Sequence, residues 1–105
     1  MDVNNNNFKQ EVLESEIPVI VDFKAPWCGY CRRLEPMALK LGEELAGKVK
    51  IVMVDIDKDP EIAEQYKVMT IPNLMLFRGG EKISSVVNPT SRDAINKWLG
   101  DNGLM

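Results

Sequence analysis

The sequence contains no histidine and only two cysteines, Cys28 and Cys31. Structural zinc sites usually take four cysteine or histidine ligands, so one copy of this chain cannot supply them. A metal site would need a second copy or unusual carboxylate ligands, and we expect no metal site. Two residues separate the cysteines, which leaves three interpretations: a structural staple, half of a metal site, or a redox pair.

An excess of basic residues is also absent, because 13 lysine and arginine residues stand against 16 aspartate and glutamate residues. Nucleic-acid-binding domains usually carry a basic stripe, so we expect no nucleic-acid partner. No apolar run approaches the roughly 20 residues of a membrane span, so no membrane partner is expected either.

The N-terminal stretch lacks the basic and apolar regions of a secretory signal, which favours a cytoplasmic location. Permanent disulfides are rare in that reducing compartment, where a CxxC pair more often serves catalysis or metal binding. The 105 residues are 45% hydrophobic, enough for one compact domain (1–105) with a core that needs no disulfide. A monomer is the default expectation.

Two apolar and β-branched runs, 17–23 and 50–57, predict strands that are covered on both faces. The stretch between them places apolar residues on one stripe at helical spacing and contains Pro36, which should kink the helix. Strand, helix and strand then form a right-handed βαβ unit.

Shorter elements are expected on either side of this unit. A helix at 8–15 would be capped by the asparagines before it. A second helix, at 59–66, would start with Asp59 as its N-cap and Pro60 in its first position. A short first strand is possible at 1–3, which would extend the sheet.

The C-terminal third predicts a hairpin and a last helix. The hairpin spans 73–87, and Gly79 and Gly80 supply the positive φ angles of its turn. Thr90 and Asp93 are spaced as a capping box for the helix. The whole order predicts an α/β fold of three layers: a central mixed sheet of four to five strands with helices on both faces.

The cysteine pair lies at the start of a predicted helix, where residues three apart have Cα atoms about 5 Å from each other. That separation permits a disulfide. Closing so short a loop adds only roughly 2 kcal/mol, so a structural staple is the weaker interpretation. The helix N-terminus favours the thiolate of Cys28. Cys31, one turn inside, should be more buried and suited to resolving a mixed disulfide.

Asp22 shares its strand face with Ile20. If helices cover both faces, its carboxyl is buried and its pKa rises. It could then accept, through water, the proton of Cys31 when that thiol attacks a mixed disulfide. The alternative is that Asp22 lies at the open end of the strand, in contact with water.

Three stretches, "VDFKAPWCGYC", "VDIDKDP" and "TIPNLMLFRGGE", resemble the thioredoxin family in order and spacing, over about residues 8–102. The resemblance implies the thioredoxin fold and a thiol–disulfide oxidoreductase that reduces disulfides of partner proteins. It implies re-reduction by thioredoxin reductase, a flavoprotein. No bound cofactor is implied, because a reversible Cys28–Cys31 disulfide carries the electrons.

The resemblance also assigns roles: Cys28 is the attacking nucleophile, Cys31 the resolving thiol and Asp22 the buried acid. It implies a cis Ile71–Pro72 bond beside the disulfide. The implied substrate-binding patch consists of Trp27, Gly29, Tyr30, Ile71 and Pro72, with Pro89 as a further candidate. The alternative for Trp27 is an ordinary packing aromatic.

The chain departs from the family pattern at four positions. Tyr30 replaces a proline, Lys24 an aromatic residue, Met53 a lysine near the buried acid, and Asn88 a glycine. Lys24 is either an electrostatic modulator that partly replaces the missing lysine, or a solvated strand-end residue. We expect a less reducing couple than in ordinary thioredoxins. Three alternatives therefore stay open: a disulfide oxidase or isomerase, a glutaredoxin-like protein, and a non-catalytic binding module. The stretch "APWCG" also resembles protein disulfide isomerase domains.

Overall fold

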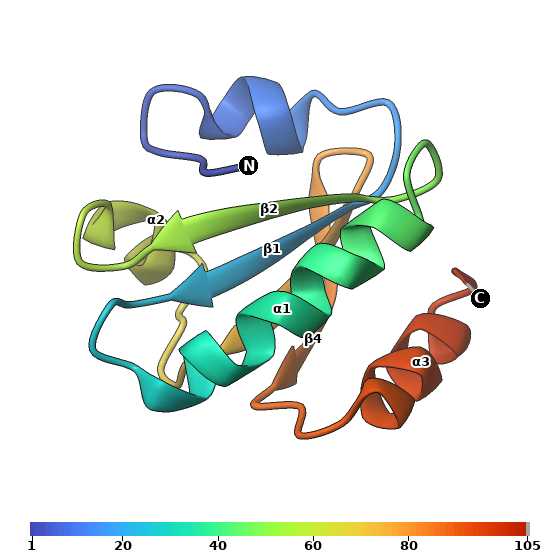
Figure 1. Ribbon diagram of the computed structural model, residues 1–105. Helices are drawn as coiled ribbons and strands as arrows, with labels where there is room; N and C mark the ends of the chain where they lie inside the picture. The colour runs from blue at the N-terminus through green and yellow to red at the C-terminus, as the bar shows by residue number, and fades with distance from the viewer. Residues whose placement is uncertain (105) are drawn as a thin grey trace.

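The computed structural model describes residues 1–104. Its elements, in chain order, are η1 (Lys9–Leu13), β1 (Val19–Lys24), α1 (Gly29–Glu44), β2 (Lys50–Asp55), α2 (Pro60–Gln65), β3 (Asn73–Arg78), β4 (Glu81–Val87) and α3 (Arg92–Asp101). The strands form one sheet in the order β2-β1-β3-β4 (Figure 1). β1 pairs with β2 in parallel and with β3 antiparallel, so the sheet is mixed.

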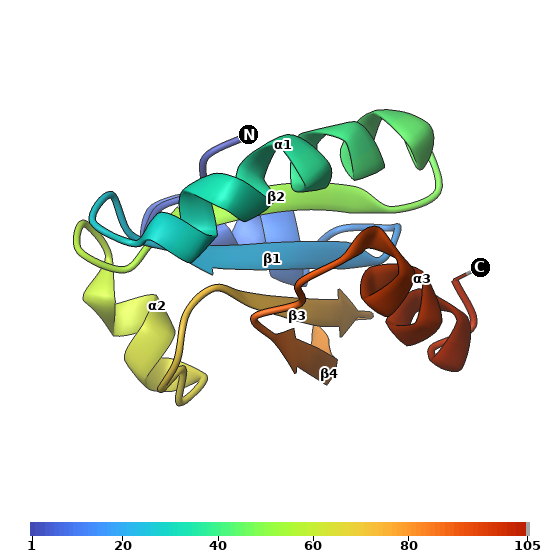
Figure 2. The ribbon, with the colours of Figure 1, turned by 60° about the horizontal axis from the view of Figure 1, so that its bottom comes forward.

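Helices cover both faces of this sheet. Residues along β1 point alternately to the two faces, and each face packs into its own hydrophobic cluster. Val21 packs with η1 and α2 in one cluster. Ile20 packs with α1 and α3 in the other. Figure 1 shows η1 on one side of the sheet and α1 and α3 on the opposite side. The turned view in Figure 2 shows α2 near one end of the sheet and α3 near the other. The predicted three-layer α/β architecture is confirmed.

The sheet has four strands, at the lower end of the predicted range. The N-terminal segment adds only an isolated parallel bridge between Asp2 and Met53. The N–H of Met53 donates to the carbonyl of Met1 at 2.9 Å, and the N–H of Val3 donates to the carbonyl of Met53 at 2.8 Å. The expected first strand is thus reduced to one bridge.

The first helix is shorter than predicted, and its expected cap is wrong. Lys9–Leu13 forms a single π-helical segment without a side-chain cap. The Oδ1 of Asn4 instead accepts hydrogen bonds from the N–H groups of Asn6 and Asn7, at 2.8 and 3.2 Å. The Oδ1 of Asn7 accepts from the N–H of Asn4 at 2.7 Å. These side chains satisfy their own turn and therefore do not cap the helix.

Of the two other predicted caps, the positions of Asp59 and Pro60 at the start of α2 are confirmed, and the one at the start of α3 is wrong. Asp59 does occupy the N-cap position of α2, but no side-chain cap bond forms there, and its Oδ1 accepts from the N–H of Asn5 at 3.0 Å. The N-cap of α3 is Ser91 rather than Thr90. Its hydroxyl accepts from the N–H of Ala94 at 3.1 Å. The proposed capping box is therefore wrong by one residue.

Other local predictions are confirmed. Gly79 and Gly80 have φ angles of 61° and 82° in the turn between β3 and β4. Pro36 lies inside α1, as expected, and does not end the helix. The kink expected from its missing N–H stays a prediction. Figure 2 shows how the short connection after β1 leads directly into α1. Both cysteines lie on this connection and the first turn of the helix.

Candidate active site

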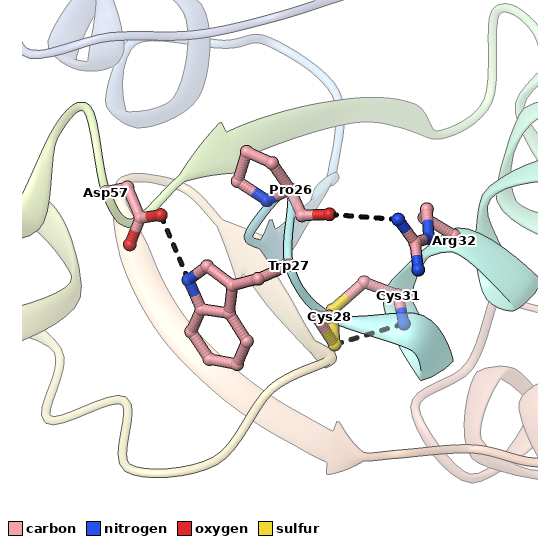
Figure 3. Close-up of a disulfide and its surroundings, with 6 residues drawn as sticks. All are labelled: Pro26, Trp27, Cys28, Cys31, Arg32 and Asp57. Carbon is pink, nitrogen blue, oxygen red and sulfur yellow. Dashed lines mark hydrogen bonds between the residues drawn. A yellow bond between two sulfur atoms is a disulfide. The ribbon is translucent and has the colours of Figure 1, made fainter.

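Cys28 and Cys31 are joined by a disulfide at the start of α1 (Figure 3). Their Cα atoms are 5.2 Å apart, close to the separation expected from helix geometry. The connection from β1 turns through a hydrogen bond from the N–H of Cys28 to the carbonyl of Ala25, 3.1 Å long. Cys28 then adopts an extended backbone conformation as the N-cap of α1.

The sulfur of Cys28 itself acts as the helix cap. It accepts a hydrogen bond from the N–H of Cys31 at 3.2 Å (Figure 3). In the dithiol form, the same position places this sulfur at the positive end of a helix of 16 residues, which favours a thiolate. The two cysteines are 6% and 5% exposed. The two cysteines are therefore equally buried, although Cys31 was expected to be the more buried one. They differ in their position in the helix, because Cys28 is the N-cap and Cys31 lies inside the first turn.

Asp22 is buried in the middle layer, with 2% of its surface exposed. It lies on the same face of β1 as Ile20, whose side chain packs against α1 and α3. Its Oδ1 has no hydrogen-bond partner among the described residues. Burial raises the pKa of Asp22 to about 7, against a lowering by Lys24. The buried interpretation is confirmed, and an open strand end in contact with water is wrong.

Lys24 is half-buried at the end of β1. Its Nζ lies 3.7 Å from Oε1 of Glu35 on α1 and 3.9 Å from Oδ1 of Asp2. It is therefore not simply a solvated lysine, because two carboxylates from other segments surround its ammonium. Glu35 was not identified as a site residue from the sequence, since nothing in its spacing indicates a partner on β1.

The loop before β3 lies against the cysteines. Ile71–Pro72 is a cis peptide bond, as the resemblance implies. Ile71 is half-buried and packs against the cluster formed by Ala25, Cys28 and Cys31. The carbonyl of Pro72, which is itself buried, accepts a hydrogen bond from the N–H of Asn88 at 2.8 Å. The loops before β3 and after β4 are thereby joined beside the site.

Two large aromatic side chains are exposed around the disulfide. Trp27 is 65% exposed and Tyr30 is 56% exposed. The indole Nε1 of Trp27 donates a hydrogen bond to Oδ2 of Asp57 at 3.0 Å (Figure 3). The guanidinium of Arg33 lies 5.3 Å from the centre of the Tyr30 ring. The interpretation of Trp27 as a packing aromatic is wrong, because most of its surface faces solvent.

The remaining residues of the predicted patch differ in accessibility. Gly29 is exposed, and a Cβ at this position would have no atom within 4 Å. Pro89 is buried, and it lines a small cavity of about 50 Å³ together with Tyr30. Gly29 is therefore accessible between the two cysteines, whereas Pro89 offers little surface to a partner.

Within residues 1–104, no three histidine, cysteine, aspartate or glutamate side chains are grouped so that they could hold a metal ion. Over the same residues, no helix has both the length and the apolar character needed to cross a bilayer.

Comparison with known proteins gives consistent matches. Residues 1–101 match the family model described as Thioredoxin. Thioredoxin 1 of Nostoc sp. (strain PCC 7120) is 43% identical over 97 residues, which cover 92% of this chain and 91% of that protein. The thioredoxin of Synechocystis sp. (strain PCC 6803) is 42% identical with the same coverage. The chloroplastic M-type thioredoxin of Spinacia oleracea is 41% identical over 102 residues, 93% of this chain and 56% of that protein.

Proposed function

Because the chain belongs to the thioredoxin family and is a thiol–disulfide oxidoreductase of the protein-disulfide reductase type, we propose that its active site is the sequence Cys28-Gly29-Tyr30-Cys31. Cys28 is the attacking thiolate and Cys31 the resolving thiol. The observation that carries this assignment is the hydrogen bond from the N–H of Cys31 to the sulfur of Cys28. Only Cys28 lies where the helix N-terminus stabilises negative charge on sulfur.

The reaction proceeds in two exchanges. The thiolate of Cys28 attacks one sulfur of the target disulfide, whose S–S bond breaks and whose second sulfur leaves as a thiolate. Cys31 then loses its proton and attacks the sulfur of Cys28. The mixed disulfide breaks, the target sulfur that Cys28 had attacked leaves as a thiolate, and the Cys28–Cys31 disulfide forms. Two electrons pass to the target without a bound cofactor.

Asp22 is proposed as the proton acceptor for the second exchange, through a water molecule. Its burial and its pKa of about 7 support this role, because a carboxyl that titrates near neutrality can both take up and release a proton there. Its Oδ1 has no partner among residues 1–104. A free acceptor atom is what a water carrying this proton requires.

The substrate-binding surface is proposed around the disulfide, from Trp27, Gly29, Tyr30, Ile71 and Pro72. Two features support it: the exposed aromatic rings and the contact of Ile71 with the cysteine cluster. An extended stretch of the target would pair with the backbone around Ile71 and present its disulfide to Cys28.

Lys24 is proposed as an electrostatic modulator of Asp22, since its charge lowers the pKa of that carboxyl. Its partners Glu35 and Asp2 hold the ammonium close to the end of β1. A cation near the acid favours the carboxylate, which is the form that accepts a proton.

The partners are proposed to be disulfide-containing proteins and a flavoprotein thioredoxin reductase, in the cytoplasm. Family membership supports the partners, and a dithiol that acts as a reductant requires a reducing compartment such as the cytoplasm. We also propose one domain over residues 1–105 that acts as a monomer. The match over residues 1–101 and the packing of both hydrophobic clusters on one sheet support a single domain.

An insulin-reduction assay tests this function. The protein with NADPH and a thioredoxin reductase should reduce insulin, and glutathione with its own reductase should support a much slower reaction. Cys28→Ser should abolish turnover, whereas Cys31→Ser should accumulate mixed disulfides with the target. Reduction that depends on glutathione alone would favour a glutaredoxin-like protein, and full activity of Cys28→Ser would contradict the assignment.

A further inference from the structure

A cavity of about 290 Å³ lies beside Cys31, between the ends of β1 and β2 and the first two turns of α1. Its charged lining residues are Lys24, Arg32, Glu35 and Asp55. Glu35 follows Cys31 by four residues, so the two side chains lie one turn apart on the same side of the helix. The cavity therefore joins the resolving cysteine to charged groups that the exchange steps do not use.

Glu35 is the better anchor for the Lys24 ammonium. The Nζ of Lys24 lies 3.7 Å from Glu35 and 3.9 Å from Asp2. The side chain of Asp2 is 84% exposed and that of Glu35 is 41% exposed. Because water and salt screen an exposed pair more strongly, the interaction with Glu35 is the stronger of the two.

The buried carboxyl of Asp22 responds to both members of this pair. Lys24 lowers its pKa and Glu35 raises it, on top of the larger rise caused by burial. On the neighbouring strands, Asp22 is opposite Met53 and Leu74, which are apolar. The other charged groups around this region are Arg32 on α1, Asp55 at the end of β2 and Asp2 on the N-terminal segment.

We propose that Glu35 is a positioning residue for proton transfer: it holds the Lys24 ammonium at the cavity beside Cys31, two residues along β1 from Asp22. This inference rests on the proposed role of Asp22 as acceptor for Cys31. The proton leaves the thiol of Cys31, passes through water to the carboxylate of Asp22, and is later released to bulk water. The fixed cation stabilises the carboxylate of Asp22.

The test is a double-mutant cycle in which the pH titration of Asp22 is measured. Carbon NMR of the Asp22 carboxyl in the oxidised protein monitors this titration. Lys24→Met should raise the proton affinity of Asp22 roughly threefold. In a Glu35→Gln background, the same Lys24→Met change should have less than half of that effect, because the ammonium is no longer held. Glu43→Gln is the matched control on the same helix, and the full effect should remain there. Lys24→Gln replaces Lys24→Met if the latter alters the fold.

Equal effects of Lys24→Met in the two backgrounds, or no effect in either, would overturn the inference. A second readout is the pH profile of the resolving exchange, which should move in the same direction as the titration of Asp22. A titration that shows the coupling without a matching change in the pH profile would also overturn it. The NMR cycle needs no substrate, so it tests the role of Glu35 without relying on the exchange reaction. The proposed role of Asp22 as proton acceptor is tested separately: an unchanged resolving rate in Asp22→Asn would contradict that role alone.

Discussion

The indole Nε1 of Trp27 donates a hydrogen bond to Oδ2 of Asp57 at 3.0 Å, although Trp27 is 65% exposed. A large exposed aromatic ring normally samples several rotamers. Here one hydrogen bond from the segment after β2 limits them, so the ring is already oriented beside the disulfide when a target arrives. Preorganisation of this kind reduces the entropic cost of binding.

Asp57→Ala should therefore weaken target binding without changing the chemistry of the thiols. We expect KM for a protein disulfide to rise about threefold, from the loss of one hydrogen bond of about 1 kcal/mol or less at an exposed site. The rate with a small aromatic disulfide should stay unchanged. Asp57→Asn keeps an acceptor oxygen and serves as the control. Equal KM values for Asp57→Ala and wild type would contradict the role of this bond.

Asp22→Asn should slow the second exchange and spare the first. The amide cannot take the proton of Cys31, so we expect the resolving rate at neutral pH to fall by about 10²-fold, as is typical for loss of a general base. Rapid mixing with a fluorescent disulfide target resolves the two exchanges. A first exchange slowed as much as the second would point to a general structural defect, and an unchanged second exchange would remove Asp22 from the mechanism.

Asp22 should also make the folded state less stable as the pH rises. A carboxyl whose pKa rises from 3.8 to about 7 on folding keeps its proton in the native state while the unfolded chain loses it. The free energy of unfolding then falls between about pH 4 and 7. Above that range, ionising the buried Asp22 lowers it by about 4 kcal/mol. Urea unfolding of the oxidised protein should show that Asp22→Asn gains stability over wild type at pH 8 relative to pH 4. The exposed Asp101→Asn should show no such gain, and a gain of the same size in both variants would rule out burial as the cause.

Tyr30→Pro should make the couple more reducing. Tyr30 is the second residue of α1, where proline fits the helix but removes one N–H of the first turn, next in sequence to the Cys31 N–H that bonds the sulfur of Cys28. Loss of one donor to a thiolate destabilises the dithiol form, so we expect the potential to fall by about 30 mV, which equals 1.4 kcal/mol for two electrons. Tyr30→Ala keeps the N–H and should leave the potential unchanged. Equilibration with a thiol buffer measures it, and equal shifts in the two variants would mean that the ring, not the N–H, sets the potential.

The fold, the Cys28–Cys31 disulfide and the burial of Asp22 could be predicted because their signals lie in short stretches of sequence. The apolar run of β1 continues through Asp22, so a carboxyl covered by helices was expected from the strand alone. The helix caps could not be predicted in the same way. Thr90 and Ser91 both offer a hydroxyl at the start of α3, and the backbone conformation of the turn decides which one accepts the hydrogen bond.

Contacts between distant segments were the main omission. The Lys24–Glu35 ion pair joins β1 to α1, and no spacing in the sequence indicates it. Asp57 could have been found, because it follows β2 and the carboxyl ends of parallel strands meet at the same edge of a sheet. Since β1 leads to Trp27 at that edge, an acceptor after β2 was a reasonable partner for the indole.

The account depends most directly on the ionisation of Cys28. The reduced Cys31→Ser variant contains one thiol, and the backbone N–H at position 31 still points at it. Ultraviolet thiolate absorbance followed across pH should show half-ionisation near pH 7, as is typical of thioredoxin CxxC thiols, against about 8.5 for a free cysteine. Half-ionisation at or above pH 8.5 would show that the helix start does not activate this sulfur, and it would contradict the assignment of Cys28 as the attacking thiolate.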